Sequence, residues 1–131
     1  RGKKLTAYGP GEIAPKHDFY DYDAKYNDPN GAELLIPARL SDERLEEIRT
    51  LAKKAFSALD LAGLSRVDFF IDKDTNALYL NEINTMPGFT QISMFPKMCD
   101  AFGLSFTNLT NLLIEEAVAR FNKTRKLQTS R

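Results

Sequence analysis

The spacing of hydrophobic residues predicts a helix that begins after Ser41. Ser41 is a suitable N-cap, the acids at 42 and 43 fall in the first turn, and Gly63 stands just past the end. Seven apolar residues recur at helical intervals: Leu45, Ile48, Leu51, Ala52, Ala55, Phe56 and Leu59. A short helix over 97–102 and a longer one over 107–121 are expected further on.

Strand-like runs occupy the other apolar stretches. Residues 64–71 and 77–83 flank a polar connection of five residues, which predicts a β-hairpin. A further strand is expected over 34–38. Residues 1–33 are rich in Gly, Pro, Asp and aromatic side chains and are expected to form short extended pieces joined by a long loop. Helices with antiparallel strands place the chain in the α+β class.

Composition narrows the range of partners. The 131 residues are 43% hydrophobic and 27% charged, and 18 basic and 18 acidic side chains give a formal net charge of zero. We therefore expect no binding to nucleic acid or to a membrane surface, and no apolar run approaches the roughly 20 residues that span a bilayer. The single cysteine, Cys99, favours a reducing, cytoplasmic compartment and is expected to be a core residue rather than a nucleophile.

The two ends carry little signal. The chain opens at Arg1 without an initiator Met, so we expect a piece of a longer protein or a junction. Residues 1–10 receive no assignment, because Gly9-Pro10-Gly11 lacks the Lys and Ser/Thr of a phosphate-binding loop. The basic residues 122–131 are expected to be a frayed tail.

The hairpin carries candidate chemistry. Side chains alternate between the faces of a strand, so Arg66 and Asp68 share one face. A turn in the middle of the polar connection would set Asp68 opposite Leu80 and Arg66 opposite Glu82, with Asn84 on the same surface. Two carboxylates and an amide oxygen are ligands that Mg²⁺ accepts beside water and phosphate oxygens.

The hairpin has two other interpretations. Arg66 and Glu82 can form a solvated surface ion pair of little energetic value. The acidic connection resembles the start of an EF-hand loop, but Ala77 and Ile83 stand where that loop needs Gly and Glu. Beyond the hairpin, Gly88 permits close approach to the backbone, and its N–H is a candidate oxyanion donor. The alternative, which the loop alone would favour without the adjacent hairpin, is a tight turn that leads into the next helix.

Three segments carry a family resemblance. Ser65–Phe70 and Leu80–Thr90 are similar to the signature of D-alanine–D-alanine ligases, and Phe19–Tyr26 resembles the mobile ω-loop of that family. The resemblance covers residues 11–121, expected to be the C-terminal ATP-grasp subdomain with its ω-loop. It implies the second half of an ATP-grasp module, a mainly antiparallel sheet with helices packed on one side.

The resemblance implies roles for the polar residues of the hairpin and the loop after it. Asp68, Glu82 and Asn84 match ligands of two Mg²⁺ ions, replaceable by Mn²⁺, that bridge the ATP phosphates. Arg66 matches an arginine that stabilises the transferred phosphoryl group and the tetrahedral intermediate. Gly88 matches the residue whose N–H supports the oxyanion.

Five further positions match substrate-binding residues of the family. Ser93 and Met94 match residues that hold the carboxylate of the second D-alanine. Lys25 matches a lysine that reaches the terminal phosphate, and Phe19 matches a residue near the adenine. Tyr26 favours D-alanine over D-lactate as second substrate.

The implied activity is ATP-dependent joining of two D-alanines through an acylphosphate, for peptidoglycan precursor synthesis, in a homodimeric parent enzyme. The 131 residues alone are expected to be inactive. The alternatives are another ATP-grasp carboxylate–amine ligase, against which residues 86–90 and the ω-loop argue, and a non-catalytic nucleotide-binding fragment.

Overall fold

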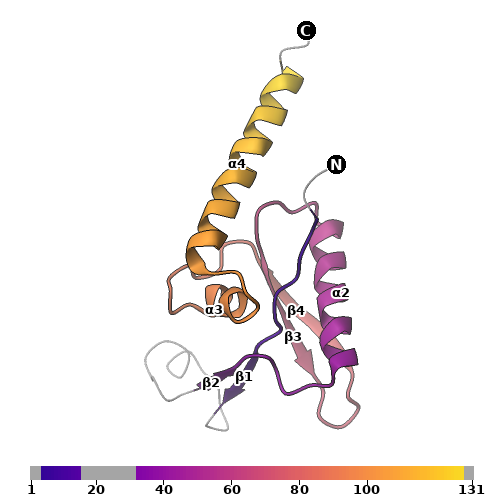
Figure 1. The fold of residues 1–131 in the computed structure, drawn as a ribbon. Coiled ribbons are helices and arrows are strands. Elements are labelled where there is room, and N and C mark those ends of the chain that lie inside the picture. The colour runs from indigo at the N-terminus through magenta and orange to yellow at the C-terminus, as the bar shows by residue number, and fades with distance from the viewer. Residues whose placement is uncertain (1–3, 16–31, 129–131) are drawn as a thin grey trace.

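The computed structural model describes residues 4–15 and 32–128. Over these ranges the chain forms two antiparallel pairs of strands and three helices, which confirms the α+β class (Figure 1). In chain order the elements are β1 (Glu12–Pro15), β2 (Ala32–Leu35), α2 (Asp42–Ala58), β3 (Arg66–Ile71), β4 (Leu78–Asn84), α3 (Met94–Ala101) and α4 (Phe106–Gln128).

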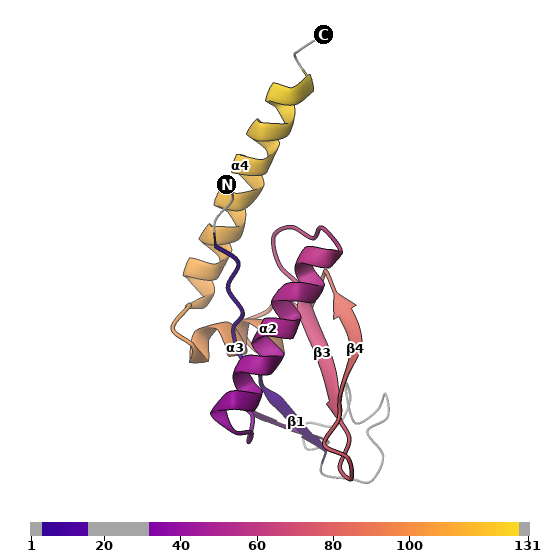
Figure 2. The ribbon, with the colours of Figure 1, turned by 90° about the vertical axis from the view of Figure 1, so that its right-hand side faces the viewer.

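Helix α2 forms where the apolar spacing predicts it. Ser41 is the N-cap, and its hydroxyl accepts a hydrogen bond from the backbone N–H of Arg44 at 3.3 Å. Leu45 and Ile48 are buried on its inner face. The helix lies alongside the β3–β4 hairpin in both ribbon views (Figures 1 and 2). The Arg44 guanidinium donates to the carbonyl of Asn76, which ties the first turns of the helix to the hairpin connection.

The segment before β1 passes between α2 on one side and α3 and α4 on the other (Figure 2). Arg49 of α2 holds it, because the Arg49 Nε donates to the carbonyl of Gly9 at 2.7 Å. The same guanidinium lies over the ring of Phe102, 5.3 Å from its centroid, at the end of α3. One side chain therefore joins three segments that are distant in sequence.

Both C-terminal helices are longer than predicted. Helix α3 begins at Met94 instead of residue 97, and α4 continues to Gln128 instead of ending at residue 121. The apolar stripe of α4 stops at Phe121, which is why the pattern gave no signal beyond it. Arg125 and Lys126 lie in the last turn, where the helix dipole favours positive charge.

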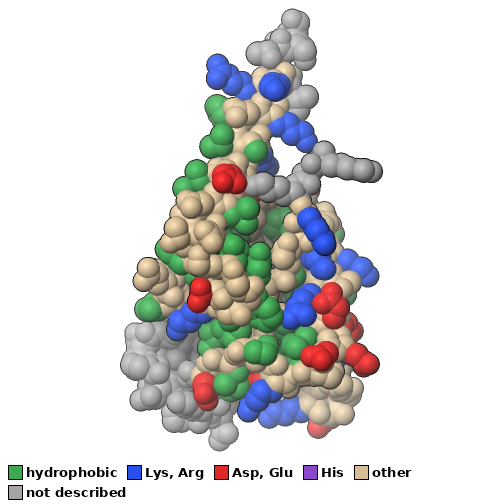
Figure 3. Space-filling view, viewed as in Figure 1, with side chains coloured by type: hydrophobic (Ala, Val, Ile, Leu, Met, Phe, Trp, Pro, Cys, Tyr) green, Lys and Arg blue, Asp and Glu red, His purple; other side chains and the backbone are tan. Residues whose placement is uncertain are grey.

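Helix α4 projects away from the rest of the molecule (Figure 1), and hydrophobic side chains continue along it from the centre of the visible face (Figure 3). Ile114, Val118 and Phe121 are exposed. Among the described residues, no helix is both long and apolar enough to cross a membrane.

The small core lies between α2, α3 and the start of α4. Its most buried hydrophobic side chains are Ala38, Leu45, Ile48, Met98, Cys99 and Leu109. Cys99 is 0% exposed, which confirms the expected core position. Burial raises the pKa of its thiol to about 11, because the thiolate would lose its hydration.

We expect Cys99 in the native full-length protein to resist a thiol reagent at pH 8 and to react readily in denaturant, as read by mass spectrometry of its peptide. The unfolded chain ionises near the ordinary value of 9.0. The folded state therefore holds its proton more tightly, and the free energy of unfolding should fall as pH rises above 9 and level off near 11. Native labelling at the rate of the unfolded chain would contradict this burial.

Candidate functional site

The register of the hairpin differs from the predicted one. Asp68 lies opposite Glu82, and Arg66 lies opposite Asn84. The prediction that Asp68 faces Leu80 and Arg66 faces Glu82 is therefore wrong. The two carboxylates are direct cross-strand neighbours, and not diagonal ones.

Part of the change in register comes from the connection between the two strands. This connection runs over residues 72–77 and is one residue longer than predicted. The Asp72 carboxylate accepts hydrogen bonds from the N–H groups of Asp74 and Thr75 and from the Thr75 hydroxyl. These bonds lower the pKa of Asp72, the backbone bond from Thr75 most, and they close the turn around this side chain.

A β-bulge at Asn81 supplies the rest of the shift. Phe69 pairs with Leu80 and Asp68 pairs with Glu82, so Asn81 has no partner in β3. Directly opposed residues share a face of the sheet, and the extra residue changes the face on which the following residues of β4 lie. Without it, the Glu82 carboxylate would lie on the apolar face.

With the bulge, the charged side chains of the hairpin lie on the face opposite to three apolar pairs. One face carries the apolar pairs Val67–Ile83, Phe69–Leu80 and Ile71–Leu78. The other carries Arg66, Asp68, Glu82 and Asn84, and beyond them the exposed aromatic pair Phe70–Tyr79. The structure thus brings four predicted site residues together, by a register that alternation alone did not give.

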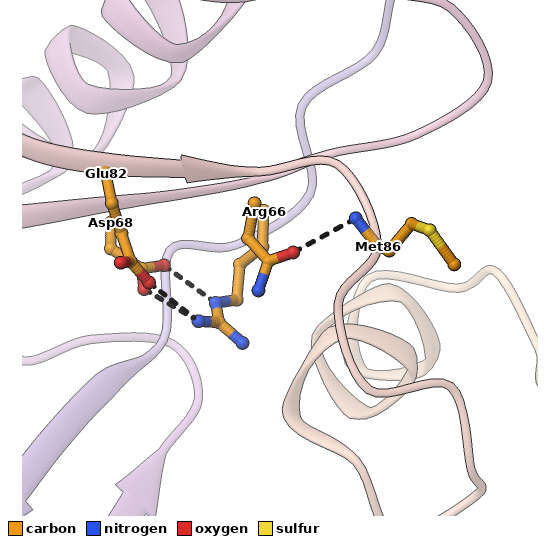
Figure 4. Close-up of polar contacts among 5 residues, drawn as sticks. Arg66, Asp68, Glu82 and Met86 are labelled. Carbon is orange, nitrogen blue, oxygen red and sulfur yellow. Dashed lines mark hydrogen bonds and ion pairs between the residues drawn. The ribbon is translucent and has the colours of Figure 1, made fainter.

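Arg66 is the centre of this polar group (Figure 4). Its Nε and one terminal nitrogen donate to the two oxygens of Asp68, each at 2.8 Å. The same terminal nitrogen lies 3.5 Å from the Glu82 carboxylate. The Arg66 side chain is 15% exposed and that of Asp68 29%, whereas that of Glu82 is 52% exposed. The Arg66–Asp68 pair is therefore bidentate and largely shielded from solvent, the geometry in which such pairs are strongest.

The donor set fits a hard cation that also binds a ligand. Asn84 directs its side-chain oxygen to the N–H of Met86 at 3.0 Å, which fixes the chain where it leaves β4 (Figure 4). No group of three or more His, Cys, Asp or Glu side chains that could hold a metal occurs among the described residues. Asp68, Glu82 and the Asn84 oxygen give only part of a coordination shell, which is typical of Mg²⁺ sites completed by water and phosphate oxygens.

The loop after β4 folds around the hydroxyl of Ser93. This oxygen accepts from the N–H of Thr90 at 3.0 Å and lies 2.8 Å from the Thr90 hydroxyl. A Cβ at Gly88 would come within 3.1 Å of the same oxygen. Glycine at 88 therefore avoids a tight contact with the Ser93 hydroxyl, which is a packing reason for glycine beside the expected role of its N–H.

Aromatic packing fixes this loop to α4. The rings of Phe89 and Phe106 lie 5.4 Å apart at an interplanar angle of 40°, and Pro87 is buried. Ser93 is the N-cap of α3, and Met94 is its first residue. The predicted substrate-binding pair thus lies at a helix start, which favours anions. The predicted ω-loop residues Phe19, Lys25 and Tyr26 lie outside the described residues.

Comparison with known proteins identifies the family. Residues 2–115 match the family model described as the D-ala D-ala ligase C-terminus. The chain belongs to the D-alanine–D-alanine ligase family. The D-alanine–D-alanine ligase of Treponema denticola is 63% identical over 128 residues, which are 98% of this chain and 35% of that protein. The chain spans about a third of the length of the ligases that it matches.

Solved ligase structures share the fold. The D-alanine–D-alanine ligase from Bacillus anthracis, complexed with ATP, matches with a TM-score of 0.71 and 28% identity, over 89% of this chain and 37% of that one. The D-Ala:D-Ser ligase from Enterococcus faecalis matches with a TM-score of 0.72 and 34% identity, over 86% of this chain and 32% of that one.

Sequence reasoning missed two features of this candidate site. It did not anticipate the bidentate Arg66–Asp68 pair, although residues two apart on a strand share a face. It gave no role to Thr90, whose contact with Ser93 depends on a loop conformation without periodicity. The bulge had a signal in the sequence, because Leu80 and Ile83 are spaced by three where regular alternation requires two.

The ring contact between loop and helix can be tested by a double-mutant cycle with Phe89→Leu and Phe106→Leu. We expect a coupling of about 0.5–1.5 kcal/mol in the free energy of unfolding, measured in urea. The control pair is Phe89→Leu with Phe121→Leu, because Phe121 is exposed and lies near the far end of α4. Additive effects in both cycles would show that the contact does not hold the loop.

Proposed function

We propose that this chain is the C-terminal part of an ATP-dependent ligase that joins two D-alanines for peptidoglycan precursor synthesis, in a homodimeric parent enzyme. The observation that carries the proposal is the polar face of the β3–β4 hairpin, with two opposed carboxylates and a shielded arginine, in a chain of this family.

Phosphoryl transfer explains why such a face is needed. A carboxylate is a poor acyl donor because its leaving group would be oxide. In the proposed reaction the carboxylate of the first D-alanine attacks the γ-phosphate of ATP and releases ADP. The amine of the second D-alanine then attacks the acylphosphate carbonyl, and phosphate leaves. Both steps concentrate negative charge that the site must neutralise.

Asp68, Glu82 and Asn84 would hold two Mg²⁺ ions, or Mn²⁺ in their place. When bound, these ions neutralise charge on the ATP phosphates. Arg66 already lies beside the carboxylates. Its planar group of donors suits the oxygens of a phosphoryl group during its transfer. Its orientation by Asp68 supports a role in stabilising the transferred group and the tetrahedral intermediate.

The loop after β4 would serve the second substrate. The Gly88 N–H would donate to the oxyanion that forms when the amine attacks. Ser93 and Met94, at the start of α3, would hold the carboxylate of the second D-alanine. Among the ω-loop residues, Lys25 would meet the terminal phosphate and Phe19 would pack near the adenine.

The first test is ADP release by the full-length protein with ATP, Mg²⁺ and D-alanine. We expect release with D-alanine and a dipeptide detectable by mass. D-Lactate and D-serine serve as alternative second substrates, and Tyr26 predicts that D-alanine is preferred to D-lactate. A folded, ATP-binding protein that releases no ADP with D-alanine would point to another ATP-grasp carboxylate–amine ligase.

The metal assignment is tested by Asp68→Asn and Glu82→Gln. Each change removes one negative charge with little change in shape, and we expect the rate of ADP release to fall by about 10²–10³. Mn²⁺ binding in the presence of ATP, followed by electron paramagnetic resonance, should weaken in parallel. The matched control is Asp72→Asn. Asp72 is an acid of the same hairpin, but its carboxylate accepts hydrogen bonds within the connection between the strands. Unchanged Mn²⁺ binding in both site variants would refute the assignment.

A further inference from the structure

The hydroxyl of Ser93 has a hydrogen-bonding arrangement that depends on Thr90. A serine hydroxyl can accept two hydrogen bonds and donate one. The Thr90 N–H fills one acceptor position of the Ser93 oxygen at 3.0 Å. The Thr90 hydroxyl lies 2.8 Å from the same oxygen, where either group can be the donor.

The direction of that second hydrogen bond decides what Ser93 offers to a ligand. If Ser93 donates to Thr90, its only hydroxyl proton is engaged in that hydrogen bond. The serine then presents only a lone pair, which repels a carboxylate. If Thr90 donates to Ser93, both acceptor positions are filled and the serine proton points away from Thr90. A carboxylate, which only accepts, selects the second arrangement.

Pro96 explains why the Ser93 hydroxyl is not used to cap the helix and can bind a ligand. The side chain of an N-cap serine commonly accepts from the backbone N–H two or three residues later. The third residue after Ser93 is Pro96, which has no N–H, and the Ser93 side chain makes no capping hydrogen bond. Its oxygen turns instead to Thr90, in the loop that precedes α3.

We propose that Thr90 is a positioning residue that donates to the Ser93 hydroxyl and directs the Ser93 proton toward the carboxylate of the second amino-acid substrate. This inference rests on the proposed function, because it assumes that Ser93 binds that carboxylate. Donation by Thr90 also polarises the serine O–H, which strengthens the hydrogen bond that Ser93 makes to the ligand.

The test uses the full-length enzyme with Thr90→Val, which keeps the β-branched shape and the backbone N–H but removes the hydroxyl. We expect the KM for the second D-alanine to rise roughly three- to ten-fold, the value of about one hydrogen bond. The KM for ATP should stay unchanged. Thr90→Ser restores a hydroxyl and should restore most of the affinity. Thr124→Val removes a threonine hydroxyl bonded to a helix carbonyl far along α4 and should change neither KM.

A double-mutant cycle separates positioning from a purely structural role. In a Ser93→Ala background there is no serine proton to direct, so Thr90→Val should raise the KM for D-alanine no further. An equal rise in both backgrounds, or no rise in either, would overturn the inference while leaving the ligase proposal intact. If the wild-type enzyme shows no D-alanine-dependent ADP release, the proposed function fails, and this inference fails with it.

Discussion

The site depends on one geometric constraint, that side chains of opposed strands share a face only when their register matches. Two acids can converge on a ligand from neighbouring strands if both point to the same side of the sheet. Here β4 carries one residue more than β3 at Asn81, and this bulge brings Glu82 opposite Asp68. The same residue keeps Ile83 with the apolar side chains. A single irregularity thus keeps the apolar pairs on one face and the charged groups of the proposed site on the other.

Charge balance follows from that register. Bringing two carboxylates together on a half-shielded face is unfavourable unless positive charge accompanies them. Arg66 supplies it from the neighbouring position on the same face, with both oxygens of Asp68 bonded. From Asn84 the chain passes directly into the loop that ends at Ser93. The hairpin residues and the loop residues of the proposed site are therefore close together in sequence.

Much of this organisation was predictable from the sequence. The α2 helix with its Ser41 cap, the β3–β4 hairpin and the shared polar face all follow from periodicity and turn chemistry. The exact pairing was not predicted, because the connection between the strands is one residue longer than expected and the bulge adds a second residue to the shift. The end of α4 was missed because its last turns carry polar helix formers and no apolar stripe. The expected roles of Ser93 and Met94 came from family resemblance alone, and the contact of Thr90 with Ser93 is visible only in three dimensions.

The position of Arg49 limits how this region can be cut. Its guanidinium is held between the Gly9 carbonyl and the Phe102 ring, so the strand-like segment before β1 is part of the folded unit. Trimming the chain to begin at β1 would remove the carbonyl that accepts from the partly buried Arg49 side chain. A shortened piece for crystallisation or spectroscopy should therefore retain Gly9 and the residues before it, although these contribute no atom to the proposed chemistry.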